Sequence, residues 1–225
     1  MLFFLYFVFV ISFCKICPLG FIQHFIIKGI DWYLMFKLVV IIVVTLIFGK
    51  IICGWICPVG FIFEVIYKIR MKIFKEDKLL KINERIHQKL IYLKYIMLVV
   101  LLILTFYLLI YVYCKGCPIW FLTHLRGSHL AIIVSIIGII ISFIIPMGFC
   151  RYICPLGAFF SIFSIKPLFQ LRTNDKCTKC NLCEDICPMQ IKITENIDQK
   201  ECIRCFECKS VCKDDAISFT SIFKK

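Results

Sequence analysis

The sequence predicts an all-α polytopic membrane protein with four transmembrane helices, followed by a small, cysteine-rich α+β domain. Of its 225 residues, 61% are hydrophobic and only 18% are charged, and the mean hydropathy is +0.93. An ordinary soluble globule does not have this composition. Apolar runs end at cysteines along the first three quarters of the chain, and the composition then turns polar. We therefore expect a membrane part over 1–171 and a separate domain over 172–225.

Three of the predicted spans have the length that crossing a bilayer requires. A helix needs about 20 predominantly apolar residues to cross the hydrocarbon core, and the runs 32–52, 91–113 and 130–149 are close to that length. The run 1–13 covers only about 20 Å at 1.5 Å per residue. We expect this first helix either to continue through its cysteine motif, thinning the bilayer locally, or to begin upstream of Met1.

Positive charge is concentrated in the membrane part and predicts its orientation. Residues 1–171 hold 17 Lys and Arg against 5 acids, and 172–225 hold 10 against 9. The segment 68–94 holds nine basic residues, whereas 15–31 and 115–129 hold two each. By the positive-inside rule, the long loop, both termini and the C-terminal domain lie in the cytoplasm. The basic excess therefore indicates a lipid bilayer as partner and does not indicate nucleic acid.

The membrane part contains an internal repeat, which predicts a duplicated two-helix unit. A C-x2-C-P motif followed by a histidine occurs twice: Cys14, Cys17, Pro18 and His24, then Cys114, Cys117, Pro118 and His124. A C-x3-C-P motif also occurs twice: Cys53, Cys57 and Pro58, then Cys150, Cys154 and Pro155. We expect the units 1–67 and 91–171, joined by the basic loop 68–90, to be related by a twofold axis along the membrane normal.

The two C-x3-C-P motifs predict a shared metal centre at the inner face. A 4Fe-4S cluster takes four thiolates and each motif offers two, so the site needs both: Cys53, Cys57, Cys150 and Cys154. Residues at i and i+4 share a helix face, and the proline after each motif can start a new helix. Structural zinc and buried apolar thiols are the alternatives.

The two C-x2-C-P motifs predict a second site at the outer face, for which the sequence leaves several occupants open. Its thiols are Cys14, Cys17, Cys114 and Cys117. An iron-sulfur cluster, another metal and a disulfide are the alternatives. His24 and His124 follow at matching positions, and we interpret them either as ligands of a metal or haem, as hydrogen-bond partners of a quinone, or as interfacial histidines bonded to backbone or water.

The C-terminal domain carries two C-x2-C-x2-C-x3-C motifs and resembles the bacterial-type two-cluster ferredoxin, in which the last cysteine of each motif binds the other cluster. The resemblance implies two 4Fe-4S clusters. The first would be held by Cys177, Cys180, Cys183 and Cys212, and the second by Cys202, Cys205, Cys208 and Cys187. Lys213 stands where a proline is usual. A domain of about 50 residues buries little core, so the clusters are expected to supply much of its folding free energy.

The whole chain resembles the polytopic ferredoxin-type membrane proteins typified by NapH and MauN, with related modules in the nitrous oxide reductase regulator and a cytochrome oxidase assembly protein. The resemblance rests on residues 53–61, 150–161 and 177–212. It implies a multi-pass protein of the cytoplasmic membrane, within a membrane complex. Such a protein passes electrons between the quinone pool or a cytoplasmic donor and a redox partner protein.

Three hypotheses of function follow. The first is a relay of electrons from the ferredoxin clusters through the inner cluster to a quinone or an outer-face acceptor. The second is a metal-handling or assembly factor that reduces or binds a soft metal such as copper at the outer face. The third is a redox-sensing subunit.

Two further expectations concern distance and catalysis. One span of about 20 residues would separate the inner and outer sites by roughly 30 Å, which is long for electron transfer. The sequence has no nucleotide-binding fingerprint, P-loop or nucleophile constellation, so autonomous catalysis on an organic substrate is not expected.

Overall fold

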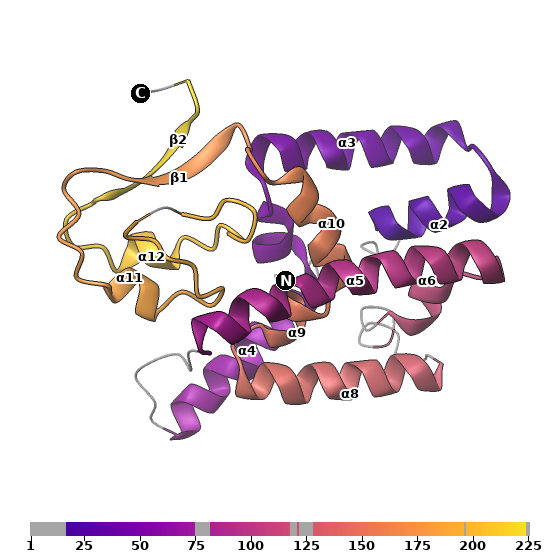
Figure 1. The fold of residues 1–225 in the computed structure, drawn as a ribbon, viewed down its shortest axis with the longest axis horizontal. Helices are drawn as coiled ribbons and strands as arrows, with labels where there is room; N and C mark the ends of the chain where they lie inside the picture. Colours follow the sequence, from indigo (N-terminus) through magenta and orange to yellow (C-terminus); the bar gives the residue numbers. More distant parts are fainter. Residues whose placement is uncertain (1–16, 75–81, 118–120, 122–127, 196, 224–225) are drawn as a thin grey trace, which may run out of the picture.

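The structure is a computed structural model that describes residues 17–74, 82–117, 121, 128–195 and 197–223. It is mostly helical, with two short strands near the C-terminus (Figure 1). The helices are α2 (Pro18–Lys28), α3 (Trp32–Phe48), the π-helix η2 (Ile52–Ile56), α4 (Pro58–Phe74), α5 (Glu84–Leu108), α6 (Val112–Gly116), α8 (His129–Ile144), α9 (Gly148–Tyr152), α10 (Pro155–Phe163), α11 (Leu182–Asp185) and α12 (Glu207–Ser210). The strands are β1 (Phe169–Thr173) and β2 (Ile217–Ser221).

Local sequence signals explain where the helices begin. Proline occupies the first position of α2, α4 and α10, where its missing N–H costs no intrahelical bond. The longer helices α3 and α5 begin after side chains that accept a backbone N–H. Asp31 accepts from Tyr33 at 3.2 Å, and Asn83 accepts from Arg85 at 3.2 Å. Such caps satisfy donors that have no partner within the helix.

One described helix is both long enough and apolar enough to cross a bilayer, the 24 residues Arg85–Leu108 of α5. The helices α3 and α8 are apolar but shorter, at 17 and 16 residues. The predicted run 1–13 lies outside the described residues. The structure therefore shows one helix of spanning length, and the four-span topology stays a prediction.

The three remaining predicted spans each end earlier than the apolar run does. The first, 32–52, ends at Phe48, because Gly49 takes φ 68° and a π-turn follows. The second, 91–113, ends at Leu108, since Leu109 is left-handed at φ 48°. The third, 130–149, ends at Ile144, before Pro146 and a left-handed Met147. Hydropathy alone carries no signal for these backbone breaks.

The helices α3, α5 and α8 run along the long axis of the molecule, and the C-terminal domain lies at one end of them (Figure 1). Helix α10 packs against α5 and α3, and α4 packs against α8. In the C-terminal domain, β1 and β2 pair antiparallel, with Phe169 opposite Ser221 and Thr173 opposite Ile217. The helices share one buried apolar cluster, and a second buried cluster fills the C-terminal domain.

The C-terminal domain is joined to the end of α3 by backbone and side-chain contacts. The amide of Leu168 donates to the carbonyl oxygen of Leu46 at 2.9 Å, and the amide of Ile222 donates to the carbonyl oxygen of Leu168 at 2.9 Å. The fully buried guanidinium of Arg204 lies directly against Gly49, where any Cβ would collide with it. The two parts of the chain are therefore docked against each other.

We expect Gly49→Ala to undock the C-terminal domain. A left-handed backbone of this kind costs a non-glycine residue of order 1–3 kcal/mol, and the new methyl would also displace Arg204. Gly29→Ala is the matched control, because Gly29 also has positive φ, 91°, but has nothing within 4 Å of its Cβ position. Thermal denaturation in detergent should show a larger loss for Gly49→Ala. Equal losses would contradict the docking role of this contact.

Candidate metal centres

The eight cysteines of the C-terminal domain lie around two separate cavities. Four of them line a cavity of about 210 Å³: Cys177, Cys180, Cys183 and Cys212. The other four line a second, smaller cavity walled by apolar side chains such as Ile193 and Ile203: Cys187, Cys202, Cys205 and Cys208. These are the two sets that the ferredoxin resemblance implies. We call them the distal and the proximal set.

The cysteines of the proximal set are more buried than those of the distal set. Cys187, Cys202 and Cys208 are buried, whereas Cys180 of the distal set is exposed. Burial raises the pKa of the Cys205 and Cys208 thiols to about 12. These thiols are protonated at neutral pH unless a metal displaces the proton, because a buried thiolate without a cation is costly.

Left-handed residues shape both cysteine loops in the same way. Lys179, Asn181 and Gln190 have positive φ in the first half of the domain. Their counterparts 25 residues later, Arg204, Phe206 and Asp215, also have positive φ. Alternation of right-handed and left-handed residues turns successive backbone N–H groups toward one point and makes an anion-binding nest. Accordingly, the Cys187 sulfur faces the backbone N–H groups of Ile191, Met189 and Gln190.

The two C-x3-C-P motifs have matching backbone geometry. The amide of Cys57 donates to Ile52, and the amide of Cys154 donates to Phe149, each at 2.9 Å and each spanning five residues. Such π-type turns within helices are frequent at functional sites. They place both second cysteines directly before the prolines that begin α4 and α10.

A glycine packs against each of these motifs in the same manner. A Cβ on Gly60 would lie 2.9 Å from the Cys53 carbonyl oxygen, and one on Gly157 would lie 3.0 Å from that of Cys150. The amide of Gly60 points at the Cys57 sulfur, and that of Gly157 at the Cys154 sulfur. The beginnings of α4 and α10 therefore present N–H groups to the thiols, which favours the thiolate form.

The structure brings these four inner cysteines together. Cys53 interacts electrostatically with Cys57 and Cys154, and Cys150 interacts with the other three. Among the residues that the structure describes, no three Cys, His, Asp or Glu side chains are close enough to hold a single metal ion.

The outer set is placed differently from the expectation. Cys14 and His124 lie outside the described residues, as does the side chain of Cys114. Cys17 and Cys117 are buried in the helical core, against which all four inner cysteines also pack. Tyr113 interacts electrostatically with Cys17 and Cys117 as well as with Cys57 and Cys154. Cys17 and Cys117 therefore lie closer to the inner cysteines than the length of a transmembrane helix.

The physical reason is that the chain turns back near both motifs. Pro18 begins α2 directly after Cys17, and this helix of 11 residues then leads away from the cysteine. On the other side, α5 ends at Leu108, and α6 leads back to Cys117. His24 lines an apolar cavity of about 190 Å³ between α2 and α3. Because His124 lies outside the described residues, the histidine pair stays a prediction.

The first C-x3-C motif touches the proximal loop of the C-terminal domain. A Cβ on Gly54 would collide with the carbonyl oxygen of Ile203. The indole N–H of Trp55 donates to the carbonyl oxygen of Arg204 at 2.8 Å, and the Trp55 ring lies 6.4 Å from that of Phe206. Residues between two inner cysteines therefore contact residues between two proximal cysteines.

A buried ion cluster lies beside this contact. The Glu201 carboxylate accepts from Lys50 at 3.0 Å and from Lys94 at 2.5 Å. The Ser161 hydroxyl lies 3.3 Å from the same carboxylate. Burial acts to raise the pKa of Glu201, but the charges of Lys50 and Lys94 outweigh it and lower the pKa to about 2. Glu201 is therefore ionised at any physiological pH.

Sequence reasoning missed this ion cluster. We counted Lys94 among the basic residues of the cytoplasmic loop, but it lies within α5 and is fully buried. A signal was present, because a lysine inside an apolar run of spanning length normally has a buried partner or a function. Lys50 likewise stands alone near the end of an apolar run. Glu201 carries no such signal.

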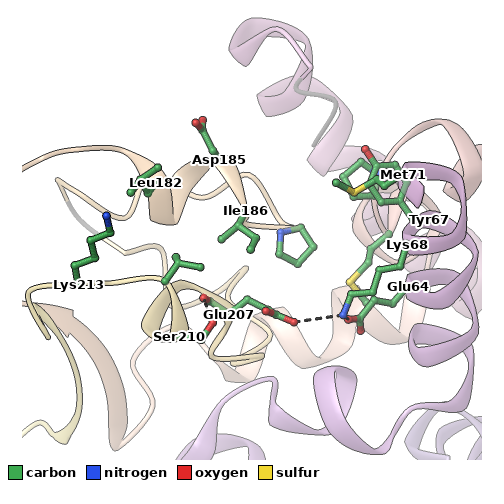
Figure 2. Close-up of a pocket in the computed structure, with 14 residues that line it drawn as sticks. Glu64, Tyr67, Lys68, Met71, Leu182, Asp185, Ile186, Glu207, Ser210 and Lys213 are labelled. Atoms are coloured by element: carbon green, nitrogen blue, oxygen red, sulfur yellow. Dashed lines mark hydrogen bonds and ion pairs between the residues drawn. The ribbon is translucent and has the colours of Figure 1, made fainter. Parts of the chain in front are cut away.

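A larger cavity of about 830 Å³ separates α4 from α11 and α12 (Figure 2). Its wall is mostly apolar and includes Tyr67, Met71 and Ile186. At its edge Lys68 bridges the two sides, at 2.6 Å from Glu64 and 3.4 Å from Glu207. Glu207 lies between Cys205 and Cys208, so the proximal loop is held to α4 by this exposed ion pair as well as by its buried contacts with Gly54 and Trp55.

Comparison with known proteins identifies the family. A model described as a 4Fe-4S binding domain matches residues 1–34, 30–75 and 128–172. The uncharacterized protein MJ0750 of Methanocaldococcus jannaschii is 61% identical over all of this chain and 94% of its own length. No solved structure matches the fold.

Two relatives with functional names are more distant. YccM of Escherichia coli, named for a proposed electron transport role, is 30% identical over 79% of this chain and 53% of its own length. The ferredoxin-type protein NapH of Escherichia coli is 23% identical over 81% of this chain and 66% of its own length. The resemblance to NapH is thus confirmed as a distant relationship. The chain belongs to the 4Fe-4S binding domain family and is an iron-sulfur protein.

Proposed function

We propose that this chain is a multi-pass membrane protein that relays electrons between two ferredoxin-type 4Fe-4S clusters and a third cluster in its helical part. The distal and proximal sets hold the first two clusters, and the inner set holds the third: Cys53, Cys57, Cys150 and Cys154. The observation that carries this proposal is the contact of Gly54 with the Ile203 carbonyl oxygen. It joins the inner and proximal cysteine loops backbone to backbone, and electron transfer between clusters requires such close approach.

The residues of each site suit a cluster. Every set offers four thiols, the number that a 4Fe-4S cluster takes. Backbone N–H groups face the sulfurs of Cys57, Cys154 and Cys187, and hydrogen bonds to sulfur stabilise the thiolate and tune the potential. A bound cluster supplies a one-electron couple at each site. The chain supplies the ligands, the exclusion of water and the spacing.

The order of the sites suggests a path. Cys180 is exposed, so a soluble electron carrier can reach the distal cluster. The proximal set lies beside the inner motifs. Met147 precedes Cys150 by three residues, and it is buried in the same apolar cluster as the proximal cysteines. Tyr113 and the buried Cys17 and Cys117 continue beyond the inner set. This continuation favours an acceptor within the membrane, such as a quinone, over metal delivery at the outer face.

The proposed cellular location follows from α5 and from charge. A helix of spanning length and apolar composition supports a location in a bilayer, and the shorter apolar helices α3 and α8 pack within the same bundle. The basic residues of the segment 68–94, without the buried Lys94, support a cytoplasmic C-terminal domain by the positive-inside rule. Such a protein works within a membrane complex whose other redox proteins supply and remove electrons.

The number of clusters tests the proposal directly. Anaerobically purified protein in detergent should contain about twelve iron and twelve sulfide per chain, at four iron per cluster. Cys53→Ser and Cys154→Ser should each remove about four iron and one EPR signal. Cys17→Ser is the control for the outer set. It should lower the iron count only if the wild-type protein holds about sixteen iron per chain, at four iron per cluster. About eight iron in the wild type, unchanged by Cys53→Ser, would refute the third cluster.

Gly54→Ala should separate the inner and proximal clusters without removing either. The added methyl collides with the backbone oxygen of Ile203, which cannot move aside as the end of a flexible side chain can. The two loops must therefore move apart. We expect full iron content but weaker magnetic coupling between the reduced clusters, measured by the power dependence of their EPR signals. Gly138→Ala is the control, since its Cβ would crowd the Phe63 ring at 2.9 Å within the helical part. Unchanged coupling in Gly54→Ala would refute the contact as the transfer point.

A further inference from the structure

We infer that four buried cations at the junction of the two parts, Lys50, Lys94, Arg151 and Arg204, are the counter-charge of the proximal and inner clusters and draw electrons toward them. We call them the junction cations. The inference rests on the proposed function and adds a direction to it. Electrons leave the distal cluster, which is oxidised, and reduce a cluster at the junction.

The junction cations outnumber the acids buried with them. Lys50 is 2% exposed, and Lys94, Arg151 and Arg204 are 0% exposed. Among the residues that the structure describes, Glu201 is the one buried carboxylate. It pairs directly with both lysines, so a single negative charge serves two ammonium groups, and its charge also reaches Arg151.

The two arginines bind neutral groups. Arg151 donates to the Gln190 side-chain oxygen at 2.8 Å, and its guanidinium lies 2.8 Å from Nδ1 of His87. Arg204 donates to the Cys202 carbonyl oxygen at 2.9 Å and to the Gln199 side-chain oxygen at 3.2 Å.

Part of each guanidinium has no hydrogen-bond partner among the described residues. These atoms are Nε and Nη1 of Arg151 and Nε of Arg204. Neutral acceptors satisfy some N–H groups, but they leave the charge uncompensated.

An uncompensated buried cation is expensive, so an anion is expected at the junction. Removing an ion from water costs several kcal/mol even after relaxation, unless an opposite charge lies close by. The described side chains provide one such charge for four cations. Four thiolates outweigh the positive iron-sulfur core that they bind, so a ligated 4Fe-4S cluster is an anion. Two clusters at the proximal and inner sites supply the missing negative charge.

The cations lie where those anions would be. Arg151 follows Cys150 in the chain and interacts electrostatically with Cys187 of the proximal set. Arg204 interacts with Cys202. Lys50 interacts with inner cysteines, including Cys53, and with proximal Cys202. Each junction cation therefore neighbours a thiol of one or both sets.

The surroundings of the distal set are different. Each set of the C-terminal domain has a carboxylate beside it, Glu184 at Cys183 and Glu207 at Cys205. The lysines near the distal set, 176, 179 and 213, are exposed, so of these two sets the proximal one alone has buried cations beside it among the described residues. Adding an electron makes a cluster more negative, so a buried cation favours the reduced state and a nearby carboxylate opposes it. The junction clusters therefore have the higher potentials, and electrons move downhill from the distal cluster.

Redox titration of the loaded protein tests the inference. Lys94→Met should lower the reduction equilibrium constant of one junction cluster at least tenfold, which is about 59 mV for one electron. Lys94→Arg should restore it, because the charge returns. Glu201→Gln should shift the same cluster in the opposite direction, since it removes the one buried anion. This reversal of sign separates an electrostatic role from general damage to the site.

Lys200→Met is the matched control, because Lys200 is exposed and adjoins Glu201 in the chain. It should leave every midpoint potential unchanged. Unchanged potentials in Lys94→Met and Glu201→Gln at full iron content would overturn the inference, as would shifts of the same sign. If the Lys94→Met protein loses iron, the midpoint potentials of Glu201→Gln and Lys50→Met decide the question. A wild-type count of about eight iron would refute the third cluster instead, and the proximal cluster beside Lys50 and Arg204 would still report on the cations.

Discussion

The close backbone approach of Gly54 and Ile203 positions most of the other features of this protein. A side chain at Gly54 would separate the two loops, so the absence of a Cβ sets how near the inner cysteines come to the proximal cysteines. Trp55 and Arg204 then close the contact on either side, Trp55 through its indole hydrogen bond and Arg204 through its position against Gly49. The buried ions assemble around this contact. Lys50, Lys94 and Glu201 come from three segments that meet only when the C-terminal domain is docked.

Cysteine spacing and the ferredoxin resemblance predicted which cysteines lie near one another, because ligand geometry constrains spacing directly, and cluster binding by these sets stays a prediction. The distal and proximal sets line separate cavities, and the inner four cysteines face one another across a local repeat that extends to Gly60 and Gly157. Hydropathy predicted the helices but not their ends. Leu109 adopts a left-handed conformation that leucine does not favour, so nothing local marks the end of α5, whereas Pro146 does mark the end of α8. The burial of Lys94 depends on a carboxylate 107 residues away, and such a pairing cannot be read from either segment alone.

Strained residues in the cysteine loops must be held in place by their surroundings. Left-handed residues other than glycine occur at three matched positions in each half of the C-terminal domain. Phe206 is bulky, and a bulky residue with positive φ is uncommon. Its ring packs 5.4 Å from Phe219 and 6.4 Å from Trp55. Such strain persists only where the surroundings over-determine it. We expect a domain of this size to obtain that constraint from metal binding and from the helices on which it docks.

The hydrogen bond from Leu168 to Leu46 has a consequence for biosynthesis. Leu46 lies in the last turn of α3, whose carbonyl oxygens lack partners within the helix. One of these is satisfied by a residue that the ribosome adds more than a hundred positions later. Leu168 in turn accepts from Ile222, near the end of the chain. The carbonyl end of the first long helix therefore gains this partner only after residue 168 has been made, so the end of α3 is completed later than the helix itself.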